Sequence, residues 1–153
     1  MSTLKVTNLQ KLDGTTFPIG KIGQVVENSS STNFTNSSTS MSELLNASIT
    51  PTSTNSKILI HFHTNCQIVA NSNAYGRATV FRGTISGTDL GALIGGSAAG
   101  SNANFPLTGT YIDSPSTTSA QQYTLGMSTA SGATTSVTTD STTYRLVLME
   151  VLA

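Results

Sequence analysis

The stretch SKILIHFHTNCQIVA, residues 56–70, holds both histidines of the chain and its single cysteine. From Ile58 onward, mostly apolar residues recur at every second position, which is the period of a β-strand that buries one face. That face consists of Ile58, Ile60, Phe62, Thr64, Cys66, Ile68 and Ala70. The opposite face is mostly polar and places His61 beside His63. The stretch therefore predicts one long β-strand with a single face in a core.

The alternation of the two faces along this strand also indicates the roles of its cysteine and histidines. Cys66 falls on the apolar face, where a thiol acts as a small hydrophobe, so we interpret it as structural. His61 and His63 project the same way and could share a metal ion, but two ligands are too few for a closed site. The main interpretation is a polar sheet face or a subunit contact. The alternative is a metal site at a trimer axis, where three such pairs would meet one ion.

Length and charge limit the classes of function. The chain has 153 residues, enough for one domain with its own core. Only 9% of them are charged, and seven basic side chains balance seven acidic ones. This balance argues against nucleic acid and against a polybasic membrane contact. We also expect no transmembrane helix, because no apolar run is long enough to span a bilayer.

Further strands are predicted from short apolar blocks separated by turn signals. They fall at residues 22–27, 75–83, 105–113, 121–129, 133–140 and 142–153, and the fourth and fifth are expected to form a hairpin around residues 131–132. Residues 40–49 leave two alternatives open. Ser40 and Glu43 have the spacing of a helix capping box, whereas an irregular strand is favoured because the segment is short and runs into TPTSTNS. Short, regularly spaced strands indicate a β-sandwich of the jelly-roll type.

The last predicted strand is apolar on both faces. Leu146, Leu148 and Leu152 share one face, and Val147, Met149 and Val151 share the other. Such a strand should be central and covered on both sides. A two-layer sandwich covers one face internally, so the other needs a partner, and we predict a homotrimer. For Glu150 we expect either an ion pair with Arg145 or a solvent-facing strand end.

The first twenty residues differ from the rest. We divide the chain into an N-terminal arm, residues 1–20, and a β-sandwich domain, residues 21–153. The arm carries spaced apolar residues, namely Leu4, Val6, Leu9 and Leu12. An extended segment of this kind can add to the sheet edge of a partner, so these four residues are the predicted attachment site.

Catalytic patterns are weak throughout. The carboxylates are scattered, and Asp113 and Asp140 sit in turns, where Asp usually makes local hydrogen bonds. No G-x-S-x-G motif is present. A depolymerase would need paired carboxylates, and no such pair stands in a recognisable context. We therefore predict a protein that is not an enzyme, with no catalytic residue and no cofactor.

Several blocks, in their order, resemble a known domain. They are GKIGQVVE, SITPTSTNSKILIHF, GRATVFRGT, YIDSPSTTSAQQYTL and YRLVLMEVLA. Together they resemble a domain common in virion proteins of tailed phages, especially marine ones, where it often forms the C-terminal part of fibre-like or head-decorating proteins. A weaker resemblance, of architecture only, is to the tumour-necrosis-factor/C1q jelly roll, which is usually a trimer.

The resemblance implies a non-catalytic structural protein at the surface of a virion. The leading expectation is a capsid decoration or head-fibre protein that docks on the capsid, or on another virion protein, through its arm. The alternative is a tail fibre or receptor-binding tip that contacts host-surface glycans. The lack of Trp weakens this alternative, as only Tyr75 and Tyr111 among the tyrosines are expected to reach a loop.

Overall fold

The computed structural model describes residues 21–70, 74–91, 94–98, 103–129, 133–137 and 143–152. The predicted arm, with Leu4, Val6, Leu9 and Leu12, lies outside these residues, as does Asp140. The described residues form strands and their connections. No helix is found among them, hence none that could cross a membrane.

The first sheet is built around its longest strand, β4 (Lys57–Ala70). β8 (Ala103–Asp113) pairs with one side of β4 along almost its whole length. On the other side, β11 (Tyr144–Leu152) pairs with the first half of β4, and β10 (Ala133–Val137) pairs with the second half. β1 (Lys21–Ser30) lies outside β11, and β2 (Phe34–Asn36) lies outside β10. All of these pairings are antiparallel.

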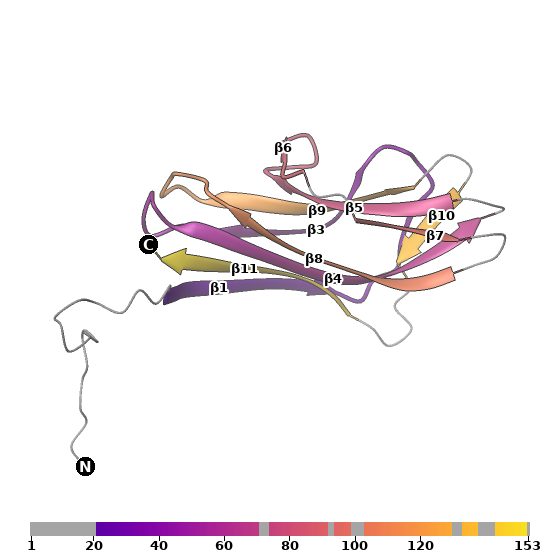
Figure 1. Cartoon of the computed structure of the whole chain (residues 1–153), viewed down its shortest axis with the longest axis horizontal. Coiled ribbons are helices and arrows are strands. Elements are labelled where there is room, and N and C mark those ends of the chain that lie inside the picture. The colour runs from indigo at the N-terminus through magenta and orange to yellow at the C-terminus, as the bar shows by residue number, and fades with distance from the viewer. Residues whose placement is uncertain are drawn as a thin grey trace, which may run out of the picture.

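The second sheet packs over the first. Its order is β3 (Ser42–Ile49), β9 (Gln121–Thr129) and β5 (Ala74–Arg82), and the far side of β5 pairs with both β6 (Thr88–Asp89) and β7 (Ile94–Ala98). Figure 1 shows the two layers, with β1, β11, β4 and β8 in one and β3, β9 and β5 in the other.

The strand order is that of a jelly roll. With the short β2, β6 and β10 set aside, the order is β1-β11-β4-β8 in the first sheet and β3-β9-β5-β7 in the second. Numbered along the chain, these strands run 1-8-3-6 and 2-7-4-5, the arrangement produced by folding one long hairpin into two Greek keys. The predicted fold class is confirmed.

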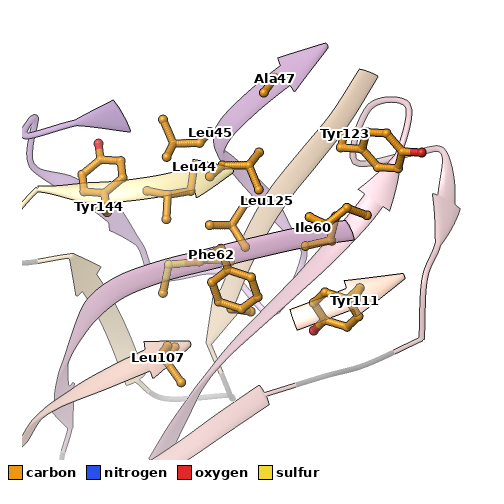
Figure 2. Packing of buried hydrophobic residues seen from close by; sticks show 14 of the residues in the cluster. Leu44, Leu45, Ala47, Ile60, Phe62, Leu107, Tyr111, Tyr123, Leu125 and Tyr144 are labelled. Carbon is orange, nitrogen blue, oxygen red and sulfur yellow. The ribbon is translucent and has the colours of Figure 1, made fainter. Parts of the chain in front are cut away.

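Side chains from the inner faces of both sheets fill the core. The predicted inner face of β4 is confirmed as far as Ile68, since Ile58, Ile60, Phe62, Thr64, Cys66 and Ile68 have no exposed surface. The side chain of Ala70 lies outside the described ones. Phe62 stacks on Tyr111 of β8 with ring centroids 6.2 Å apart. Leu125 of β9 lies opposite them, as Figure 2 shows. Burying each large apolar side chain contributes about 1.5–3 kcal/mol, so this shared interior holds the sheets together.

Two local predictions can be compared with the structure. Residues 42–49 form strand β3, so the strand alternative is confirmed. Glu43 makes no helix cap there and instead accepts a hydrogen bond from the side chain of Asn46. The predicted hairpin is wrong, because β9 belongs to the second sheet while β10 crosses to the first. β10 occupies the part of β4 that β11 leaves unpaired, and this long-range partner outweighs the local turn signal.

Candidate functional site

The outer face of the first sheet carries a row of apolar side chains that crosses the sheet from edge to edge. Val25, Met149, Leu59 and Ile112 are successive cross-strand neighbours on β1, β11, β4 and β8. The two end members are open to solvent, with Val25 56% and Ile112 66% exposed. Val151 and Ile22 on one side of the row, and Val147 on the other, widen it.

We call this set the apolar patch: Ile22, Val25, Leu59, Ile112, Val147, Met149 and Val151. It contains every large hydrophobic residue classed as exposed in the described part of the chain. β11 lies inside the sheet, between β1 and β4, as predicted. One chain covers only its core face, however, and Val147, Met149 and Val151 remain partly exposed. This is the face for which a partner copy is predicted, and its covering by that partner stays a prediction.

The two histidines lie just beyond the patch on the same outer face. His61 is partly buried, and its Nδ1 is 3.0 Å from the hydroxyl oxygen of Thr110 on β8. His63 is exposed, directly across from Arg145 of β11. Arg145 in turn binds Glu27 of β1, with Nη1 2.7 Å from Oε1. Both histidines thus lie on the outer face of β4, as strand parity predicts, and their role as a polar sheet face or subunit contact stays a prediction.

No metal centre can be built from the described residues of one chain, where no three side chains among His, Cys, Asp and Glu gather closely enough to hold an ion. A shared site between copies stays a prediction. Cys66 lies on the opposite face of β4, fully buried, and burial raises the pKa of its thiol to about 12. The thiol is therefore neutral and unreactive at physiological pH.

A buried carboxylate closes one end of the sandwich. Glu150 of β11 shares the core face with Leu146 and Leu148 and has no exposed surface. The backbone N–H and the hydroxyl of Thr52 donate hydrogen bonds to its Oε1, at 2.6 and 2.8 Å. The Nε2 of Gln24 on β1 donates to Oε2 at 3.0 Å. Burial alone would raise the pKa of Glu150, but these hydrogen bonds lower it to about 2.

This arrangement corrects the expectation for Glu150. The carboxylate neither pairs with Arg145 nor faces solvent. Instead it joins β11 to β1 and to the loop between β3 and β4. Gly23 makes room for it, because a Cβ atom there would lie 3.0 Å from Oε2 of Glu150 and 2.9 Å from Cδ2 of Leu152. The pairing of β1 with β11 shifts register at this point.

A second polar cluster joins the two sheets at the end of β8. Nη1 of Arg82 lies 3.2 Å from both carboxylate oxygens of Asp113. The hydroxyl of Tyr123 donates to Asp113 Oδ2 at 2.7 Å, and burial together with this bond raises the pKa of Tyr123. Asp113 thus bonds to side chains on two strands of the other sheet, where local turn bonds were expected. Tyr111 does not reach a loop, because it is buried in the core.

Comparison with known proteins gives only distant likenesses. No protein-family model matches the chain, and no curated protein matches it. Among solved structures, a capsid chain of the infectious bursal disease virus particle is 11% identical with a TM-score of 0.45. The VP2 subviral particle of the same virus is 14% identical with a TM-score of 0.44. Both matches cover 98% of this chain.

This chain spans well under half the length of those viral chains, 40% and 42% respectively. A Bacillus endospore appendage protein that forms disulfide-linked pili is 13% identical, with a TM-score of 0.37 over 91% of this chain and 100% of that one. With TM-scores below 0.5, none of these structures supplies a residue correspondence for this chain.

Proposed function

We propose that the chain is a non-catalytic structural protein of a virion, which assembles as a homotrimer and is fixed to the particle surface as a capsid decoration or head-fibre protein. The observation that carries the proposal is the apolar patch. A row of apolar side chains across the whole width of a sheet is unfavourable in water and marks a contact surface.

The simplest partner that could cover the patch is a second copy of this chain. Lys57 pairs with Val151 at one end of the patch, and Glu27 pairs with Val147 at the other. Both charged side chains are exposed, so Lys57 of one copy can approach Glu27 of the next, which also binds Arg145 of its own chain. The chain has no net charge that would drive copies apart. Three copies, rather than two, follow from the resemblance to trimeric jelly rolls.

The virion role rests on the resemblance to tailed-phage structural proteins and agrees with the chemistry of the described residues. The buried carboxylate of Glu150 is held by hydrogen-bond donors, and Asp113 is held by Arg82 and Tyr123, so both brace the sandwich. The tail-fibre alternative would need a ligand surface on the loops. Burial of Tyr111 removes one of the two tyrosines expected there.

Two measurements test the proposal. Light scattering on the full chain should give a trimer at micromolar concentration. A stable monomer in solution, with a monomeric or two-fold arrangement on the particle, would contradict trimerisation.

Quantitative mass spectrometry and labelled electron microscopy of purified virions should find many copies on the head. A few copies confined to the tail would favour the fibre alternative, and absence from virions would overturn the proposal.

A further inference from the structure

The outer face of the second sheet, opposite the apolar patch, holds an arginine that is fixed in place by a tyrosine. Arg77 of β5 lies over the ring of Tyr75, with its guanidinium carbon 4.7 Å from the ring centroid. One terminal nitrogen of Arg77 also donates a hydrogen bond to the hydroxyl of the same tyrosine. The ring contact and the hydrogen bond together fix the plane of the guanidinium before any ligand arrives.

Arg77 lacks a counter-ion among the described residues. The ion pairs found there belong to Arg82 with Asp113 and to Arg145 with Glu27. The Nε of Arg77 is buried and has no hydrogen-bond partner in the described structure. A buried donor without an acceptor is costly, so a group that supplies one is bound favourably.

A second buried donor lies directly across the sheet. Ser128 of β9 is the cross-strand partner of Arg77, and both lie on the face opposite the core residues Ala78 and Met127. Such partners hold their Cβ atoms about 4.5–5.5 Å apart. Ser128 is only 1% exposed, and its hydroxyl also has no partner in the described structure. On the other side Arg77 is paired with Gly95 of β7, which has no side chain to reach over it.

We propose that Arg77 and Ser128 form a binding site for a carboxylate, with Tyr75 as the residue that positions the guanidinium. A carboxylate offers two oxygens, one for the Nε–H of Arg77 and one for the hydroxyl of Ser128, and its charge neutralises the arginine. Both a free organic acid and the acidic unit of a saccharide carry such a carboxylate. The site lies on the sheet opposite the patch, so trimerisation through the patch does not cover it.

The test follows the Nε–H resonance of Arg77 by nuclear magnetic resonance on the full chain, while acetate, glucuronate or glucose is added. Acetate and glucuronate should both shift this resonance, and glucose should not. Tighter binding of glucuronate than of acetate would identify the saccharide as the source, and equal binding would identify a small acid. No shift with either acid overturns the proposal.

Two variants sharpen the test, with affinities measured by calorimetry. Arg77→Lys keeps the charge but loses the Nε–H, so glucuronate affinity should fall about tenfold or more. Ser128→Ala should weaken binding severalfold while leaving the urea midpoint unchanged, because its hydroxyl has no partner to lose. Lys21→Gln removes one exposed positive charge elsewhere and should change nothing. If Lys21→Gln weakened glucuronate binding as much as the other variants, or if Ser128→Ala lowered the urea midpoint, Arg77 and Ser128 would not form a specific site.

Discussion

At the scale of single residues, Glu150 shows how a charged group is kept inside an apolar sandwich. Sequence parity already places it with Leu146 and Leu148, yet we expected either an ion pair with Arg145 or a solvent-facing strand end. The sequence alone does not show which residues donate hydrogen bonds to the buried carboxylate. Thr52 and Gln24 come from distant parts of the chain, and only the fold brings them to one carboxylate.

Replacing Glu150 by Gln should lower the free energy of unfolding at pH 7 by about 3 kcal/mol, because the folded-state pKa is about 2 against an ordinary value of 4.5. A lowered pKa stabilises the fold above pH 4.5, and that stability is lost as the pH falls towards 2. The difference between the natural chain and the variant should therefore shrink between pH 4.5 and pH 2, as measured by urea unfolding.

The exposed residue Glu43 provides the matched control for this experiment. Glu43→Gln should change stability by less than about 0.5 kcal/mol. An equal loss for Glu150→Gln at pH 7 and at pH 2.5 would contradict the role assigned to its charge.

The histidines give a second prediction at this scale. Gln at positions 61 and 63 can replace the hydrogen bond to Thr110, and His63 is exposed, so the double variant should keep its assembly state. Its stability at neutral pH should stay within about 0.5 kcal/mol of the natural chain. Light scattering with and without a chelator checks both points. Loss of trimers on chelation would show that the imidazoles hold a metal between copies.

At the scale of elements, period-two patterns predicted β4 and β11 well, because each strand buries one mostly apolar face. The partners of the strands were less predictable. β10 was assigned to β9 through a Ser-Gly turn signal, whereas in the structure it continues the ladder along β4. The apolar patch shows the same contrast. The sequence indicated a second apolar face on β11, but its continuation through Val25, Leu59 and Ile112 depends on the register of four strands.

That continuity predicts the effect of charges placed in the patch. The double variant Val25→Asp, Ile112→Asp alters two exposed side chains, so each copy should stay folded with little change in its urea midpoint. The same variant should fail to trimerise, because burying two carboxylates in an apolar contact is strongly unfavourable. Light scattering measures the outcome. Ser48→Asp, at an exposed position on the second sheet, is the control, and a double variant that remains trimeric would exclude the patch as the interface.

At the scale of the whole molecule, the two sheets divide the work that we propose. The first sheet presents the apolar patch to other copies, and the second presents Arg77 and Ser128 to ligands. The arm, which lies outside the described residues, is predicted to provide attachment to the particle. One copy of such an arm binds weakly, but three on one trimer bind with avidity.

Deleting residues 1–20 should leave a folded, soluble trimer that no longer attaches to virions, since Leu4, Val6, Leu9 and Leu12 are lost together. Co-sedimentation with particles lacking the protein measures attachment, and light scattering confirms the trimer. Replacing the same four residues by Ser in the full chain controls for arm length and should have the same effect. Full occupancy by the truncated chain would place the docking surface on the sandwich.

The antiparallel pairing of β1 with β11 has a mechanical consequence. The chain enters the sandwich at Lys21, directly beside Leu152, and β1 then runs the length of β11. A tether pulling at Lys21 along the strand would load the hydrogen bonds between β1 and β11 in shear, so they would share the force and break together. Gln24, bound to Glu150, braces the loaded end. The strand pair would therefore resist such a pull as a unit, and β1 would not peel away bond by bond.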